Sequence, residues 1–450
     1  MDKANVVFVF GDQWRAQATG YAGDPNVKTP HLDRLAEQSL NLTNAVSGCP
    51  VCTPYRGSLL TGEFPLTNGL FTNDVPLDTD AVGLGTAFQR AGYRTAYIGK
   101  WHVNDHGRKA YIPPERRRGF EFWRTLECTH DYWNSIYYAD DEREQRVWDG
   151  YDAFAQTREA CRYIRDHDSD DPFLLMLSWG PPHNPYKTAP DEYKSLYDPD
   201  GLTLRPNVPP EREAEARRDL VGYYGHISAL DTCVGQLTDT LEECGLSENT
   251  IFVFTSDHGD MVGCHHWKTN KQCPYDESIM VPFLIRWPDG LPEGAQTVRT
   301  PIDAPDIMPT LLSLCDAEIP SSVEGRDLTP ALRGKDDPSE DDGIIIANYA
   351  PFADWNKVER GGREYRGLRT TRYTYVTDRD GPWMLFDNRE DPYQMENLID
   401  LPDARPVREH LQKILDRKME ERGDEFLSAR EYLEMWNYDY DETGTVPYTS

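Results

Sequence analysis

Four apolar runs stand out in the pattern of hydrophobic and polar positions along the chain. They cover residues 5–10, 93–98, 173–179 and 251–255. Their β-branched and aromatic residues mostly lack polar alternation, which is typical of strands buried on both faces of a parallel sheet. Helices are predicted between them, at residues 31–38, 84–91, 151–167 and 214–244. Strands that alternate with helices predict an α/β fold with a large, mostly parallel central sheet flanked by helices.

Each of the four runs leads into residues that can bind a metal or carry a charge. These residues are Asp12 and Gln13, Lys100 and His102, His183, and Asp257 and His258. Ligands of open α/β sheets bind beyond the carboxyl ends of the strands. We therefore predict that one site at that edge of the sheet gathers these side chains.

A change of pattern near residue 345 predicts a second, smaller unit. Short strand-like runs and a later helix are predicted at 366–371, 373–376, 383–387 and 407–421. This order is typical of an α+β unit with an antiparallel sheet. We predict a catalytic domain at 1–345 and a C-terminal subdomain with a tail at 346–450. The last residues, 432–450, give no structural or functional signal.

The composition favours a soluble globular protein with a large core, since 38% of the 450 residues are hydrophobic and 28% are charged. No apolar run approaches the length of a membrane span, and the first strand-like run starts at residue 5, so no signal peptide is expected. Nine cysteines, an odd number, are scattered rather than arranged as a disulfide framework. We expect a cytoplasmic location for the chain as encoded, and a periplasmic or secreted one if a leader was removed.

The formal net charge of −30 comes from 77 Asp and Glu against 47 Lys and Arg. Nucleic acids are bound by an excess of Lys and Arg, so this balance argues against a nucleic-acid partner. An anionic substrate would need a local pocket of positive charge within a repulsive overall field.

The stretch from Cys52 to Gly62 carries the most specific motif. It reads Cys52-Thr53-Pro54-Tyr55-Arg56, followed by Gly57-Ser58-Leu59-Leu60-Thr61-Gly62. A Cys-x-Pro-x-Arg followed by Thr-Gly resembles the signature of the type I sulfatases, a formylglycine-dependent family of the alkaline phosphatase-like superfamily. The resemblance implies that a maturation enzyme oxidises Cys52 to formylglycine, whose hydrated aldehyde attacks the sulfur of a sulfate ester. Tyr55 departs from the family pattern, in which this position is usually a small residue.

The same cysteine also completes a C-x-x-C, Cys49-Pro50-Val51-Cys52. Such a pair can be redox-active or form half of a zinc site. The sequence contains no second C-x-x-C to complete a four-cysteine site. We therefore favour the nucleophile over a redox pair, and a redox pair over structural zinc.

The resemblance also implies a metal site at two strand ends. Asp12, Gln13, Asp257 and His258 match the family's metal ligands residue by residue, and Cys52 is expected to join them as a further ligand. Carboxylate and amide oxygens favour Ca²⁺, with Mg²⁺ as an alternative, and the imidazole adds Mn²⁺ as a third candidate. Helix capping is the alternative role for the two aspartates, but two such pairs at two strand ends favour a metal.

Catalytic roles follow from the same resemblance for residues after the middle strands. Lys100 and His102 correspond to the pair that contacts hydrated formylglycine, with His102 as the base that expels sulfate. His183 resembles the histidine that binds sulfate and assists the leaving group. The alternative roles are solvated side chains and a loop histidine that caps a turn.

Three further residues complete the candidate site. Lys271 lies four residues before Tyr275 and fits the second sulfate-binding lysine, with Lys268 as its competitor. Arg56 is predicted to hold the turn that carries Cys52, because its planar guanidinium can donate several hydrogen bonds to nearby acceptors. Asn73 is a candidate sulfate contact, and a turn asparagine is the alternative.

These residues predict hydrolysis of sulfate esters, with a sulfated carbohydrate as the expected substrate and a maturation enzyme as the expected partner. A phosphonate monoester or phosphodiester hydrolase is the nearest alternative, because the Asp-Gln and Asp-His pairs also occur in formylglycine enzymes of that activity. A binding protein in which Cys52 is never oxidised is the non-enzymatic alternative. It would be expected to lack metal ligands or lysines that are present here.

Overall fold

The computed structural model describes residues 3–167, 169, 171–266, 269–335, 342–353 and 362–448. Within them, a ten-stranded sheet has the order β10-β2-β9-β8-β1-β7-β3-β4-β5-β6. Its strands are β1 (Asn5–Asp12), β2 (Leu40–Leu42), β3 (Arg94–Lys100), β4 (Phe122–Leu126), β5 (Ile136–Ala139), β6 (Arg146–Val147), β7 (Phe173–Pro182), β8 (Thr250–Ser256), β9 (Leu284–Arg286) and β10 (Gln296–Val298). The four predicted strands form the adjacent centre of this sheet as β8, β1, β7 and β3, all parallel. The predicted fold class is thereby confirmed.

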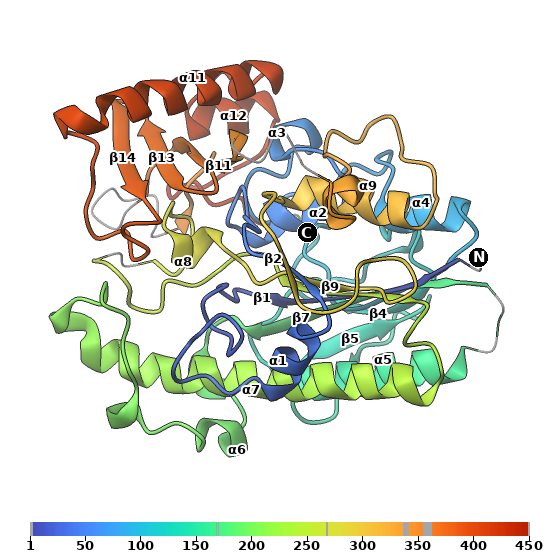
Figure 1. Ribbon diagram of the computed structural model, residues 1–450. Coiled ribbons are helices and arrows are strands. Elements are labelled where there is room, and N and C mark those ends of the chain that lie inside the picture. The colour runs from blue at the N-terminus through green and yellow to red at the C-terminus, as the bar shows by residue number, and fades with distance from the viewer. Residues whose placement is uncertain are drawn as a thin grey trace.

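Helices cover both faces of this sheet (Figure 1). The described helices are α1 (Pro30–Ala36), α2 (Cys52–Thr61), α3 (Pro65–Asn68), α4 (Leu84–Arg90), α5 (Asp152–Asp166), α6 (Asp191–Lys194), α7 (Glu213–Glu243), α8 (Asp276–Ile279), α9 (Ala304–Leu314), α10 (Thr329–Leu332), α11 (Arg405–Glu421) and α12 (Ala429–Met435). Of these, α11 and α12 lie away from this sheet. Alternate residues of β1 serve the two faces, as strand geometry requires. Phe8 belongs to the core beneath α2, α4 and α9, and Val9 to the core over α1, α5 and α7.

The predicted helices are present with shifted ends, and one important helix was not predicted. The helix expected at 31–38 is α1, which ends at Ala36, and the long one expected at 214–244 is α7. Helix α2 was expected only as a turn. All ten of its residues are buried, so it shows none of the polar and apolar alternation that identifies a surface helix.

A separate antiparallel sheet lies beside the main one, in the order β11-β12-β13-β14. Its strands are β11 (Ile344–Asn348), β12 (Tyr365–Arg369), β13 (Tyr373–Asp378) and β14 (Gly381–Asp387). Helix α11, predicted near 407–421, packs on it, and α8 joins it to the main body through a shared apolar cluster. This confirms the predicted C-terminal antiparallel subdomain. Strand β11 spans the boundary expected at residue 345, and the division at that residue stays a prediction.

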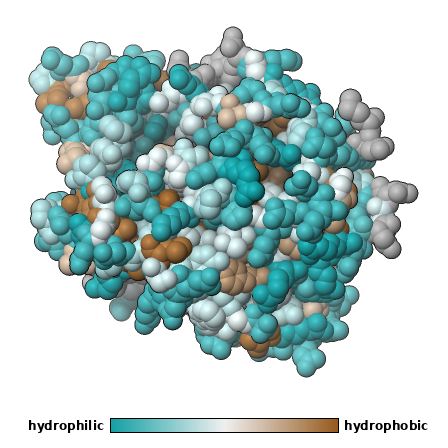
Figure 2. All heavy atoms as spheres, turned by 60° about the horizontal axis from the view of Figure 1, so that its bottom comes forward, coloured by the Kyte–Doolittle hydropathy of each residue, from teal (hydrophilic) through white to brown (hydrophobic). Residues whose placement is uncertain are grey.

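None of the described helices is both long and apolar enough to cross a membrane. On the face shown in Figure 2, hydrophilic residues predominate and hydrophobic ones form small separated patches.

Candidate active site

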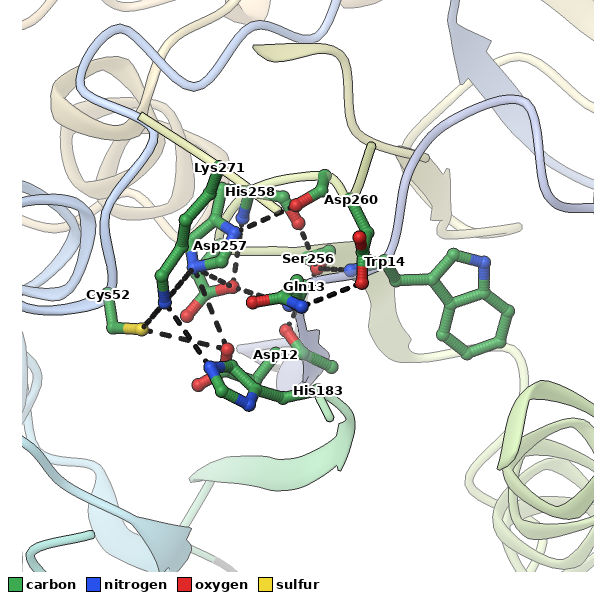
Figure 3. Close-up of polar contacts among 12 residues, drawn as sticks. Asp12, Gln13, Trp14, Cys52, His183, Ser256, Asp257, His258, Asp260 and Lys271 are labelled. Carbon is green, nitrogen blue, oxygen red and sulfur yellow. Dashed lines mark hydrogen bonds and ion pairs between the residues drawn. The ribbon is translucent and has the colours of Figure 1, made fainter. Parts of the chain in front are cut away.

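The carboxyl ends of the central strands and the first turn of α2 meet at one buried position. Asp12 ends β1, Lys100 ends β3, His183 follows β7 and Asp257 follows β8, while Cys52 begins α2. In Figure 3 the labelled side chains of Cys52, Asp12, His183 and Lys271 point toward one another, whereas Trp14 points away. The structure thus brings together the residues that the sequence analysis placed at the strand ends.

Cys52 lies at the first position of α2 and meets three polar groups. Its Sγ is 3.0 Å from Lys271 Nζ, 3.3 Å from His258 Nε2 and 3.7 Å from Asp12 Oδ1. Burial and Asp12 raise the pKa of the thiol, but the positive charges around it, Lys100 first among them, outweigh both and hold it well below its usual value. The N-terminus of a helix also favours negative charge. Negative charge at the Sγ position is therefore stabilised.

Four buried groups here have the composition of a divalent cation site. One ligand atom each from Asp12, Cys52, Asp257 and His258 lies within 4.8 Å of the others. His258 Nδ1 donates to the Gly259 carbonyl at 3.0 Å. Its Nε2 therefore carries the lone pair that faces the cluster, as in histidines that bind a metal.

Gln13 gives an independent test of whether this cluster fits a cation. Its Nε2 donates to Asp260 Oδ2 at 2.6 Å, which turns Oε1 toward Asp257 (Figure 3). Oε1 is buried and has no hydrogen-bond partner. An unsatisfied buried acceptor costs about 1–3 kcal/mol, and Gln13 also has a left-handed backbone with φ of 70°. The residues present therefore fit a divalent cation bound through Asp12, Gln13, Asp257 and His258.

Arg56 forms ion pairs with both aspartates of the site, Asp12 and Asp257. Its Nη2 is 3.3 Å from Asp12 Oδ2 and 3.2 Å from Asp257 Oδ2, and its Nη1 donates to Ser178 Oγ at 2.7 Å and to the Lys100 carbonyl at 2.9 Å. The side chain is 1% exposed. This fits the predicted role, because the guanidinium fixes both carboxylates relative to α2.

Lys271 and His183 also lie at the nucleophile position, close to each other. Lys271 Nζ is 3.3 Å from His183 Nε2, and His183 Nδ1 donates to the Asn184 carbonyl at 2.7 Å. Burial and the Lys271 charge hold the pKa of His183 well below its usual value, so its imidazole is neutral. Lys100 Nζ pairs with Asp12 Oδ2 at 2.5 Å. Lys268, the competitor of Lys271, lies outside the described residues.

His102 is paired with a buried aspartate, Asp74. Its Nε2 bonds Asp74 Oδ1 at 2.9 Å, and both side chains are buried. Burial lowers the pKa of His102, but the Cys128 thiolate and the bond with Asp74 raise it to about 10. Cys128 itself, although buried, has its pKa lowered to about 6 by Lys100 and His102.

Asn73 packs against the start of α2. Its Oδ1 accepts a hydrogen bond from the Thr53 backbone N–H at 3.0 Å and so serves one of the free amides of the first helical turn. Its role as a sulfate contact stays a prediction. Cys49, the other cysteine of the C-x-x-C, is buried in the core and is not disulfide-bonded to Cys52.

Sequence reasoning missed three residues that support the site. Ser178 bonds Arg56, Asp260 orients Gln13, and Asp74 pairs with His102. Asp260 was visible, since it lies three residues after Asp257 in the same strand-end motif. Asp74 gave no signal apart from its place beside Asn73, because its partner lies on another strand end.

These features are typical of one class of protein: a hydrolase with an α/β sheet whose candidate site combines a helix-terminal nucleophile, a group that could bind a cation, and lysines suited to an anionic ester. Comparison with known families gives its identity more closely. The family described as Sulfatase matches residues 4–317, and the one described as N-sulphoglucosamine sulphohydrolase, C-terminal, matches residues 263–421. The chain belongs to the type I sulfatase family and is a sulfuric ester hydrolase.

Three relatives show how far the similarity extends. An ulvan-active sulfatase of Formosa agariphila is 46% identical over 99% of this chain and 87% of its own length. An endo-4-O-sulfatase of Bacteroides thetaiotaomicron is 32% identical over 95% of this chain and 94% of its own length. A solved structure from a glycosaminoglycan-metabolism locus of that bacterium is 29% identical, with a TM-score of 0.85 over 96% of this chain and 99% of the other.

Proposed function

We propose that the protein removes sulfate from a sulfated carbohydrate and uses formylglycine at position 52 and one divalent cation. Ca²⁺ is the cation that we favour. The observation that carries this proposal is the convergence of Lys271, His258 and Asp12 within 3.7 Å of Cys52 Sγ. The carbohydrate substrate is inferred from the relatives, one ulvan-active and one an endo-4-O-sulfatase. A maturation enzyme that oxidises Cys52 is the partner that this chemistry requires.

Hydrated formylglycine would supply a nucleophilic hydroxyl for the covalent chemistry. The cation would act as a Lewis acid, and its charge would offset the negative charge of the sulfate oxygens. Asp12, Gln13, Asp257 and His258 would hold the cation. The oxygen-rich donor set, with an orphaned amide oxygen on Gln13, supports Ca²⁺ over softer metals.

The chain's own cations bind and orient the sulfate group. Lys271 lies beside the nucleophile position, and Lys100, although paired with Asp12, is close enough to lower the pKa of Cys52. Both ammonium groups can donate to sulfate oxygens, and their charge is worth more in a buried site than in water. This local pocket resolves the conflict between an anionic substrate and a net charge of −30.

The two histidines contact different groups, which assigns them different tasks. His183 is neutral in the free protein, and the negative charge of a bound sulfate ester would raise its pKa and let it carry a proton to the leaving oxygen. Although burial opposes them, the Cys128 thiolate and the bond with Asp74 raise the pKa of His102 to about 10. Its ring must therefore first give up a proton before it can take one from the hydroxyl at position 52 when sulfate leaves.

The test is turnover by protein produced together with a formylglycine-generating enzyme. We expect sulfate release from an aryl sulfate and from a sulfated oligosaccharide, with far slower hydrolysis of an aryl phosphonate monoester. Cys52→Ala is the matched negative control. Faster turnover of the phosphonate ester than of every sulfate ester would instead favour the phosphonate hydrolase.

A further inference from the structure

The C-terminal end of the chain reaches the active site, although its sequence gave no signal. Beyond α12, Tyr438 packs on Phe71 with ring centroids 5.7 Å apart, and its hydroxyl donates to the Gly69 carbonyl at 3.2 Å. These contacts anchor the chain beside the loop that carries Asp74. The chain then continues to Tyr448, whose hydroxyl accepts a hydrogen bond from Arg108 Nε at 2.9 Å.

Burial raises the pKa of Asp74, but His102, the nearby Tyr448 hydroxyl and the Arg108 charge together hold it below its usual value. Asp74 therefore interacts with two distant parts of the chain, through a hydrogen bond with His102 and through the proximity of Tyr448 and Arg108. The loop at Asp74 has a left-handed backbone, with φ of 63°. A left-handed, buried aspartate costs free energy, so the surrounding contacts must hold it in place.

His102 is held just as firmly and is left with one free ring nitrogen. Its backbone is also left-handed, with φ of 60°, and its carbonyl accepts from Thr53 Oγ1 at 2.9 Å. Nε2 faces Asp74, whereas Nδ1 is buried without a hydrogen-bond partner. When the His102 ring is neutral, a carboxylate that accepts from Nε2–H leaves the lone pair on Nδ1, which is the state that a proton acceptor needs.

We propose that Asp74 is a positioning residue that fixes the ring orientation and tautomer of His102, and that Tyr448 holds Asp74 in place. The inference rests on the proposed function only in assigning the base role to His102. The pairing itself concerns side chains that exist without formylglycine or metal. It makes the C-terminal end of the chain part of the catalytic apparatus.

The first experiment reads the tautomer directly. Histidine-¹⁵N-labelled protein, metal-free and with Cys52 as the thiol, is compared with Asp74→Asn and Tyr448→Phe by NMR, and His102→Gln identifies the His102 signals. We expect a strongly hydrogen-bonded proton on His102 Nε2 in the wild type, and no proton on Nδ1 once the pH exceeds the raised pKa of this ring. This signal should be lost in Asp74→Asn and weakened in Tyr448→Phe.

The second experiment measures kinetics of the matured, metal-loaded enzyme on an aryl sulfate. Asp74→Asn should lower kcat by about 100-fold or more, with KM changed by less than about twofold, because it disturbs proton transfer and not binding. Tyr448→Phe should lower kcat by about tenfold or less, since it removes a polar hydroxyl beside a charged group. Asp80→Asn, an exposed carboxylate on the same loop, and Tyr440→Phe are the matched controls and should leave kcat unchanged.

The proposal is overturned if His102 keeps its tautomer and hydrogen-bonded proton in Asp74→Asn, or if that variant turns over like Asp80→Asn. If the wild type released no sulfate at all, the proposed function would fail. The NMR comparison would then still decide whether Asp74 positions His102. If Asp74→Asn did not fold, Tyr448→Phe would decide, and an unchanged His102 signal in that variant would overturn the role of the C-terminal tyrosine.

Discussion

Replacing Arg56 with Met should destabilise the protein more than the loss of any surface ion pair. The guanidinium is 1% exposed and donates to Asp12 and Asp257, which are both fully buried. Methionine keeps much of the apolar stem but removes the charge and all five N–H donors. Two adjacent carboxylates would then remain buried with less positive charge to offset them.

The size of this effect can be worked from the contacts. Removing one partner of a buried ion pair costs about 3–5 kcal/mol, because it leaves an uncompensated buried charge. The Ser178 hydroxyl and the Lys100 carbonyl each lose the Arg56 donor in the same substitution, although the carbonyl keeps its bond from the Tyr97 hydroxyl, so the upper part of that range is expected. Arg56→Lys keeps the charge but loses the planar, forked guanidinium, so it should lower the free energy of unfolding by less than Arg56→Met does.

The assay is urea unfolding of metal-free protein, since a bound cation would partly replace the missing charge. Arg94→Met is the matched control. Arg94 pairs with Asp171 at 3.1 Å, but the two side chains are 58% and 51% exposed, and such pairs contribute about 0–1 kcal/mol. If Arg56→Met lowered the free energy of unfolding no more than Arg94→Met, the argument that Arg56 neutralises the two aspartates would be refuted.

Three more predictions concern the metal, the leaving group and acid stability. Asp257→Ala should lose bound metal and nearly all activity, and full metal occupancy by elemental analysis would show that the metal site is assigned wrongly. His183→Ala should slow aryl sulfates with poor leaving groups more than those with good ones, because a stable leaving anion needs little protonation; equal losses across the series would make His183 a binding residue only. Glu277, held by Arg205 at 3.0 Å, has its pKa lowered far below the usual 4.5 although burial opposes this. Its stabilisation is therefore complete above that value and is lost as the pH falls toward the folded pKa, so Glu277→Gln should cost more stability at pH 7 than at pH 3 in urea unfolding.

The centre of the fold was predictable because its strands are long and fully buried. Strands β1, β3, β7 and β8 form continuous apolar runs, and their parallel arrangement fixes which edge carries the polar side chains. The outer strands β2, β9 and β10 were not predicted, since each is three residues long and too short to show a period. Helix α2 escaped for a different reason, because burial on all sides removes its amphipathic pattern.

In the candidate site, too, residues with a local sequence signal could be predicted, whereas residues defined by contacts between distant segments could not. Asp12 and Asp257 could be found from strand ends, and Cys52 from its motif. Asp74 and Tyr448 could not, because their role depends on contacts between a loop, a strand end and the C-terminal end of the chain. Such contacts leave no mark in local sequence pattern and are visible only once the chain is folded.

The most direct test of the account is to measure the chemical state of residue 52 and the sulfatase activity on the same samples. Protein made with and without a formylglycine-generating enzyme gives a series of preparations with different degrees of maturation. Mass spectrometry of the peptide that contains residue 52 gives the aldehyde fraction, and sulfate release gives the specific activity. We predict that activity rises in proportion to the aldehyde fraction and is absent in Cys52→Ala, while Cys49→Ala keeps substantial activity. High activity in protein that carries only the encoded thiol would contradict the account.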